Sequence, residues 1–210
     1  RRLGGSVCYN FEVKSCALTN ILQKKAKLRE MALACRRETA SEAGLRAGMC
    51  VADHVVEYFQ KWHASIVAGY LPLGDEIDPV PALNYLKQMG WQLTLPVVIG
   101  KGEPLLFRHW RQGDVLETGV LNTRHPLPSA SVLTPDVLLV PLLAFDKKGQ
   151  RIGWGGGFYD RTIAALRTQR STLVLGVAFS CQQVDEVPCD NHDELLNGVI
   201  TETGAYNFGS

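Results

Sequence analysis

A glycine-rich run between Arg151 and Arg161 carries the strongest chemical signal in the sequence. Four of the five positions from 153 to 157 are glycine, and a predicted helix follows directly. Glycines let the backbone approach a ligand closely, and amides at a helix N-terminus attract anions. The run lacks the Lys-Ser or Lys-Thr of a Walker loop and the spacing of a dinucleotide-binding loop. It therefore predicts a phosphate site of another kind, with a tight turn that binds nothing as the alternative.

Charged residues beside this run indicate a polyphosphate held together with a divalent cation. Arg151 opens the run, and its planar guanidinium suits phosphate oxygens. Asp160 falls in the first helical turn, where a carboxylate can also simply complement the helix dipole, worth roughly 0.3–1 kcal/mol. A carboxylate beside a polyphosphate requires a cation between them, and Mg²⁺ prefers one or two carboxylates plus phosphates and waters. Asp193 is the candidate second carboxylate, although a lone aspartate in a polar segment is usually solvated.

A helix predicted over residues 18–38 places a lysine where apolar side chains are expected. Lys25 falls inside the apolar stripe of this helix and Arg29 lies at its edge, at about 100° per residue. A lysine in this position either extends its charge back to solvent or reaches a buried anion. Three other basic residues are predicted on the solvated face: Lys24, Lys27 and Arg37.

An acidic cluster, Asp75, Glu76 and Asp78, follows the strand predicted over residues 64–71. In open α/β sheets, ligands bind beyond the carboxyl ends of the strands, which is where this cluster falls. Asp78 is explained as the N-cap of the next helix, with Pro79 at its first position. Glu76 has no such role and can accept hydrogen bonds from a donor-rich heterocycle. The five histidines show no metal-binding spacing, and no Ser-His-Asp or Cys-His arrangement stands out.

The order strand, helix, strand in the second half of the chain predicts a parallel sheet. An apolar strand over 137–145 leads through the glycine-rich run to a helix over 158–167 and a strand over 172–179. We therefore predict an α/β fold with one domain over 18–205, whereas residues 1–17 read as poorly ordered or left over from expression. The other predicted elements are helices over 41–62 and 79–89, an antiparallel strand pair over 92–99 and 105–110, a loop or flap over 112–135, and a short strand over 199–201 in a polar tail.

Composition is that of an ordinary globular protein. The 210 residues include 22 basic and 21 acidic side chains, so no global charge attracts nucleic acid or an anionic membrane. No apolar stretch approaches the roughly 18 residues of a membrane span. Six scattered cysteines without a C-x-x-C pair read as reduced thiols rather than disulfides. We expect a cytoplasmic monomer with no nucleic-acid or membrane partner.

Several motifs together resemble one enzyme family. The runs 140–146 and 149–161 form a long and specific motif, and Lys25-x-x-Leu28-Arg29 forms another. These residues closely resemble the 5-formyltetrahydrofolate cyclo-ligase (methenyltetrahydrofolate synthetase) family. The resemblance spans about residues 20 to 205 and includes three further segments, 70–72 with 75–78, 188–193, and 200–202.

The resemblance implies a three-layer α/β/α fold with a mostly parallel central sheet, and a reaction that uses ATP and Mg²⁺. In that reaction 5-formyltetrahydrofolate and ATP become 5,10-methenyltetrahydrofolate, ADP and phosphate. Catalytic roles would fall to Lys25, Arg151 and Tyr159, and magnesium would be held by Asp160 and Asp193. By the same resemblance ATP would contact Lys25, Arg29, Arg151, Ile152, Gly153, Trp154, Gly155, Gly156, Gly157, Phe158 and Tyr159. The folate would contact Leu71, Glu76, Trp154, Gly155, Gly156, Gly157 and Phe158.

Three departures from the family pattern limit the transfer of contacts. Trp154 stands where tyrosine or arginine is more usual, and Asn197 where an aspartate often occurs. Residues 119–124 replace a Gly-Ile-Pro-Glu-Pro-like segment, so the contacts of the 112–135 segment stay open. Two rival functions are an isomerase that holds a sugar monophosphate without ATP, and a non-catalytic nucleotide- or folate-binding module. Asp160 and Lys25 argue against the isomerase, and the complete set from 151 to 160 argues against the module.

Overall fold

The computed structural model describes residues 7–61, 63 and 65–208, with side chains from residue 20 onward. Its first element, α1 (Val7–Phe59), contains one non-helical residue, Gly44, with φ 44° and ψ −135°. The two helices predicted to meet near residue 40 therefore meet at Gly44, where the absence of a Cβ permits this conformation. Residues 7–17 lie in α1. Outside the described residues lie positions 1–6 of the predicted N-terminal segment, Trp62 at the predicted helix end, and Ala64 at the predicted strand start.

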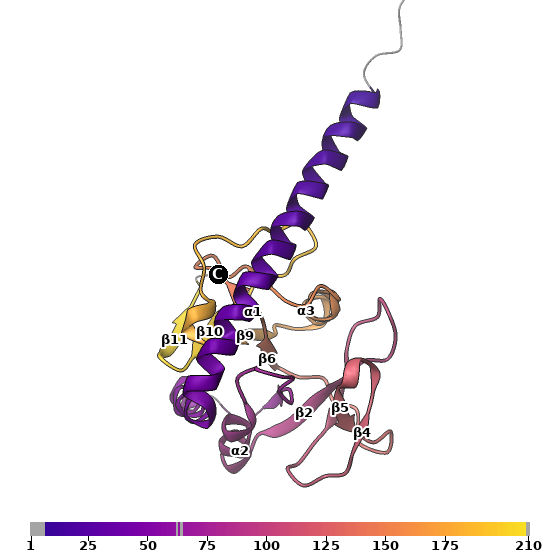
Figure 1. The fold of residues 1–210 in the computed structure, drawn as a ribbon. Helices are drawn as coiled ribbons and strands as arrows, with labels where there is room; N and C mark the ends of the chain where they lie inside the picture. Colours follow the sequence, from indigo (N-terminus) through magenta and orange to yellow (C-terminus); the bar gives the residue numbers. More distant parts are fainter. Residues whose placement is uncertain (1–6, 62, 64, 209–210) are drawn as a thin grey trace, which may run out of the picture.

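A seven-stranded sheet forms the centre of the fold (Figure 1). Its order is β11-β10-β9-β6-β1-β2-β3, and all neighbours are parallel except the two edge pairs β2–β3 and β10–β11. The mostly parallel sheet and the antiparallel pair β2–β3 confirm the predictions, whereas the edge strand β11 was not predicted. The strands are β1 (Ile66–Ala68), β2 (Gln92–Val97), β3 (Leu106–His109), β6 (Val137–Pro141), β9 (Leu173–Val177), β10 (Gly198–Thr201) and β11 (Gly204–Asn207).

Helices cover both faces of this sheet, as the alternation along β6 illustrates. Val137 and Leu139 pack in one core with α1 and α2 (Val80–Gln88), while Leu138 and Val140 pack in another with α3 (Phe158–Gln169). Successive side chains of a strand point to opposite faces, so a strand buried on both faces reads as a continuous apolar run. The fold is therefore the predicted α/β/α arrangement.

The segment 112–135 is more ordered than the predicted loop. It contains the antiparallel pair β4 (Leu116–Thr118) and β5 (Arg124–Pro126), joined through the short 3-10 helix η1 (Val120–Asn122). Arg108 on β3 anchors the pair, because its Nη1 donates to the Pro126 carbonyl at 2.7 Å and lies 3.3 Å from Glu117. The sequence did not predict these strands, because each is only three residues long and lies in a segment rich in proline and glycine, where no periodicity is evident.

The predicted strand over 137–145 is two strands. β6 ends at Pro141, and β7 (Ala144–Phe145) then pairs antiparallel with β8 (Arg151–Ile152). Between them Asp146, which is fully buried, accepts hydrogen bonds from the amides of Lys148 and Gln150 at 2.8 and 3.1 Å. This hairpin carries Arg151 to the end of the sheet, where the glycine-rich loop begins.

Cysteines and hydropathy add two further findings. Free thiols are present at Cys35, Cys50, Cys181 and Cys189, as predicted, while the side chains of Cys8 and Cys16 lie outside the described set. Within the described part of the chain, no helix has the length and apolarity needed to cross a membrane. The cytoplasmic location and the monomeric state stay predictions.

Candidate active site

The glycine-rich loop connects β8 to α3 and packs against α1. Gly155 and Gly157 have φ of 93° and 65°, in the left-handed region that favours glycine, and Gly157 immediately precedes α3. Arg29 donates from Nε to the Gly153 carbonyl at 2.9 Å. A Cβ on Gly155 would lie 3.1 Å from Nη2 of Arg29. The predicted N-terminal arginine and the predicted phosphate loop are therefore in direct contact.

Arg151 and Asp160 form an ion pair at the base of the loop. Nη2 of Arg151 lies 2.6 Å from Oδ1 of Asp160, and the arginine side chain is buried. Arg151 also donates through Nη1 to the Glu194 carbonyl, and the Glu194 amide donates to Oδ1 of Asp160 at 3.1 Å. These contacts hold the Glu194 backbone against Arg151 and Asp160. The segment that carries Asp193 therefore lies next to Asp160, the other predicted metal ligand.

Lys25 reaches two carboxylates of the C-terminal segment. Its Nζ lies 2.6 Å from Oδ2 of Asp193 and 2.9 Å from Oδ2 of Asp190. Burial lowers the pKa of Lys25, but the hydrogen bonds and charges of Asp193 and Asp190 outweigh it, so the pKa is raised. The hydrogen bond from Lys25, aided by the His192 amide, lowers the pKa of Asp190. Lys25 is buried and contacts two anions, but these carboxylates are themselves partly exposed, at 31% for Asp190 and 18% for Asp193.

Glu76 and Trp154 meet on the side of the loop that faces the acidic cluster. Nε1 of Trp154 lies 3.4 Å from Oε1 of Glu76, whose Oε2 accepts from the Leu73 amide at 2.9 Å. Burial raises the pKa of Glu76, against the opposing effects of the Leu73 amide, the Arg36 charge and Trp154. Asp78 accepts from the Val80 amide at 2.9 Å. The N-cap of α2 is Pro79, however, so the prediction of Asp78 as the cap and Pro79 as the first helical residue is wrong by one position.

The remaining predicted site residues lie around these contacts. Burial, followed by the nearby charge of Glu76, raises the pKa of Tyr159, so its hydroxyl stays protonated at neutral pH. Phe158 carries the Arg161 guanidinium 5.2 Å above its ring, and a Cβ on Gly156 would meet that same ring at 2.8 Å. Ile152 is buried and Leu71 is half-buried against the α1–α2 core. Their roles in binding stay predictions.

Three residues at the site were missed in the sequence. Asp190 pairs with Lys25, the Glu194 backbone bridges Arg151 and Asp160, and Arg36 lies 3.8 Å from Glu76. Arg36 follows Arg29 by seven residues, which is close to two full helical turns, so the two share one face of α1. That spacing was the available signal for Arg36. Asp190 and Glu194 lie in an irregular segment, where no periodicity could point to them.

The donor set suits magnesium bound together with phosphate. Among the described residues, no three histidine, cysteine, aspartate or glutamate side chains converge on one point as a complete metal cage. Mg²⁺ instead favours one or two carboxylates completed by phosphates and waters. Asp160 and Asp193 can supply those carboxylates, because each is partly exposed, at 28% and 18%, beside the glycine-rich loop.

Known proteins match both the sequence and the fold. Residues 21–202 match the 5-formyltetrahydrofolate cyclo-ligase family. The chain belongs to this family. It is therefore an enzyme of the cyclo-ligase type. The 5-formyltetrahydrofolate cyclo-ligase of Escherichia coli K12 is 31% identical over 181 residues, covering 82% of this chain and 97% of its own length. The relative from Haemophilus influenzae is 30% identical over 186 residues, covering 85% and 97% respectively.

A solved structure agrees with the family assignment. The 5,10-methenyltetrahydrofolate synthetase of Aquifex aeolicus superposes with a TM-score of 0.70 and 25% identity, covering 89% of this chain and 93% of that one. The synthetase of Mycoplasma pneumoniae, at 23% identity and a TM-score of 0.68, shares the fold over 85% of this chain and 98% of its own. The family match covers all the segments that meet at the glycine-rich loop.

Proposed function

We propose that this enzyme uses ATP and Mg²⁺ to convert 5-formyltetrahydrofolate into 5,10-methenyltetrahydrofolate, with release of ADP and phosphate. One observation carries the proposal: two segments distant in sequence, α1 and the C-terminal segment, meet at the glycine-rich loop and its flanking residues. Lys25 and Arg29 come from α1, Arg151 and Asp160 flank the loop, and Asp193 comes from the C-terminal segment. Family membership supports an enzyme over a binding module or an isomerase.

The basic side chains at the loop are suited to the triphosphate. Lys25 and Arg151 are now neutralised by carboxylates at 2.6 Å. A triphosphate between them would take over as their partner, and Asp160 and Asp193 would hold Mg²⁺, which would neutralise phosphate charge. The loop amides and the α3 N-terminus add further donors. Phosphoryl transfer depends mainly on such positioning and charge stabilisation, so no protein nucleophile is needed.

The other side of the loop is suited to the folate. Glu76 can accept hydrogen bonds from the amino and ring N–H groups of a pterin, and its low exposure of 5% strengthens them. Trp154 offers an aromatic surface next to this carboxylate and belongs to the loop that binds the phosphates. The loop thus brings the formyl group of the folate and the γ-phosphate of ATP together.

Two chemical steps follow from this arrangement. The formyl oxygen attacks the γ-phosphorus, the bond to ADP breaks, and an iminium phosphate forms. N10 of the same folate then attacks the formyl carbon, the carbon–oxygen bond breaks as phosphate leaves, and N10 releases its proton. The second attack is intramolecular, so the folate itself supplies the proximity. Lys25 and Arg151 stabilise charge on the transferring phosphoryl group, and the protonated Tyr159 hydroxyl can donate a hydrogen bond beside them.

A direct assay tests the proposal. The purified enzyme is mixed with 5-formyltetrahydrofolate, ATP and Mg²⁺, and the near-ultraviolet absorbance of the methenyl product is followed. We expect this absorbance to rise only when all three are present, with one ADP formed per product. A folded enzyme that leaves the absorbance unchanged would contradict the proposal, and product formation without ATP would contradict the mechanism.

A further inference from the structure

Arg36 is a buried cation with unused hydrogen-bonding capacity. The residue is 2% exposed, yet among the residues that the structure describes its Nε and Nη1 find no hydrogen-bond partner. Its closest charged partner is Glu76, whose Oε1 lies 3.8 Å from Nη1, beyond hydrogen-bonding distance. A buried donor without a partner destabilises the folded state, and does so more strongly when the group is charged. Such a group needs an explanation, and an acceptor supplied by a ligand is one.

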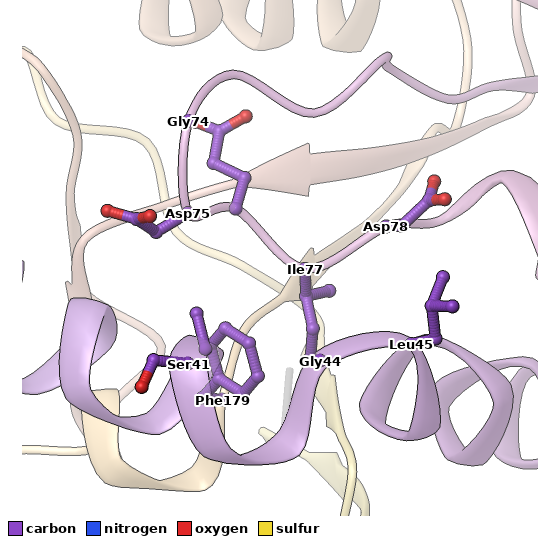
Figure 2. A pocket seen from close by; sticks show the side chains of 10 residues that line it. Ser41, Gly44, Leu45, Gly74, Asp75, Ile77, Asp78 and Phe179 are labelled. Atoms are coloured by element: carbon purple, nitrogen blue, oxygen red, sulfur yellow. The ribbon is translucent and has the colours of Figure 1, made fainter.

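The surroundings of Arg36 place it at the folate side of the site. The Arg36 guanidinium lies 5.5 Å from the centre of the Trp154 ring, and Trp154 in turn contacts the same Glu76 oxygen. One helical turn further along α1, an open pocket of about 270 Å³ begins at Ala40 and extends to Glu76. Figure 2 shows this pocket between the Ser41–Leu45 part of α1 and the segment that carries Asp75 and Asp78. Open space for a ligand therefore exists beside Glu76.

We propose that Arg36 determines specificity for the folate by donating hydrogen bonds to the 4-oxo oxygen of the pterin ring. This inference rests on the proposed function. A pterin presents its 2-amino group and N3–H as donors directly beside the 4-oxo acceptor. Glu76 accepts from the donors, and Arg36, 3.8 Å away, supplies the complementary donor. The carboxylate and the guanidinium together match one edge of the ring.

A phosphate is the less suitable ligand for Arg36. The Glu76 carboxylate beside it would repel a phosphate group. The phosphate site has its own cations, Lys25 and Arg29, and Arg29 lies seven residues earlier on the helix, a distance of about 10 Å. One face of α1 thus carries the contacts for phosphate at one point and those for the ring two turns later.

The test compares two ligands that differ at the 4-position and, as a consequence, in the proton on N3. Binding of 5-formyltetrahydrofolate and of its 4-amino analogue, in which a donor replaces the acceptor oxygen, is measured by calorimetry on the full chain. We expect the wild type to prefer the 4-oxo compound by about tenfold or more, as for a lost hydrogen bond to a charged group. Arg36→Met should reduce this ratio to the part that the contact of N3–H with Glu76 contributes, while its affinity for ATP stays at the wild-type value.

The neighbouring arginine provides a matched control. Arg37 is 70% exposed in its side chain and lies 3.5 Å from Asp75. Arg37→Met therefore removes the same charge but leaves the contacts among Glu76, Arg36 and Trp154 in place. We expect this variant to keep the wild-type ratio. Arg36→Met leaves the Glu76 carboxylate buried without its cation, which can impair folding. The same substitution is therefore also made in a Glu76→Gln background, where both buried charges are removed, and this double variant is compared with Glu76→Gln alone.

The outcomes separate the inference from the proposed function. If Arg36→Met, or the double variant against its own background, keeps the full preference for the 4-oxo compound, Arg36 is only a counter-ion of Glu76 and the inference is wrong. A wild type that binds both compounds equally also overturns it, with the proposed function intact. A wild type that binds neither reduced folate overturns the proposed function and the inference together.

Discussion

Lys25 and Asp193 are 168 positions apart in the sequence, yet their Nζ and Oδ2 atoms lie 2.6 Å apart. This pair joins α1 to the C-terminal segment directly beside the glycine-rich loop. It brings a cation suited to phosphate and a carboxylate suited to Mg²⁺ into one site before either ligand is bound. On the proposed function, binding of Mg–ATP would exchange these partners, because each side chain would gain a ligand of opposite charge.

Arg151→Ala should reduce the rate of methenyl product formation by on the order of 10²–10³ at saturating ATP, because it removes stabilisation of the transferring phosphoryl group. Circular dichroism checks the fold, since Arg151 also holds Asp160 and the Glu194 carbonyl. Arg170→Ala is the matched control: Arg170 is 41% exposed in its side chain and pairs with Asp136 at 2.8 Å. Wild-type kinetics for Arg151→Ala would remove its catalytic role.

Lys25→Met should change the pH dependence of stability in two ranges. The raised pKa of Lys25 means that its contribution is complete below its ordinary value and is lost as pH rises above about 10. The lowered pKa of Asp190 means that its contribution is complete above its ordinary value and is lost as pH falls below about 4. Urea unfolding should therefore give the largest difference between wild type and variant near neutral pH.

The exposed neighbour Lys24 supplies the control for this comparison. For Lys24→Met, the free energy of unfolding should differ from that of the wild type by the same amount at every pH. A difference between wild type and Lys25→Met that is the same at pH 3, 7 and 11, within about 0.3 kcal/mol, would mean that the Lys25 ion pairs do not stabilise the folded state.

Asp160→Asn should raise the Mg²⁺ concentration needed for half-maximal activity by about tenfold or more. Even the loss of a group that only hydrogen-bonds to a metal ligand lowers metal affinity by about this factor. Asparagine keeps the shape of the side chain and can still accept from the Glu194 amide, but it lacks the charge. The measurement is initial rate against Mg²⁺ at fixed ATP. Asp185→Asn, at an exposed carboxylate outside the site, is the control. An unchanged Mg²⁺ requirement in Asp160→Asn would exclude Asp160 as a ligand.

Glu76→Gln should make the free enzyme more stable than the wild type, and this difference in the free energy of unfolding should grow as pH rises. Burial raises the pKa of Glu76, so the folded state holds this proton more tightly than the unfolded chain does. Wild-type stability therefore falls as pH rises from about 4.3 through the raised value, and the glutamine variant lacks that loss. Unfolding free energies of the two proteins should coincide near pH 4 and diverge by pH 7. A gap of constant size across this range would contradict the raised pKa. The same variant should bind 5-formyltetrahydrofolate more weakly, because it lacks the carboxylate that we propose accepts from the pterin.

The sequence determined those features that depend on local physics. A continuous apolar run predicted β6 as a strand buried on both faces, and four closely spaced glycines predicted the bend before α3. The Asp-Pro pair predicted the start of α2 to within one residue. Each of these follows from backbone conformation or side-chain periodicity within a few residues. The inward position of Lys25 was likewise evident from the helical period, but the identity of its partner was not.

Tertiary structure decided which distant residues meet. The contact of Lys25 with Asp190, the bridge from the Glu194 backbone to Arg151 and Asp160, and the burial of Arg36 beside Glu76 all join segments remote in sequence. No local pattern encodes these contacts, because they arise from the order of strands in the sheet and from the path of α1 across its end. The same holds for β4, β5 and β11, whose short strands form by pairing with partners rather than by the preference of their own residues.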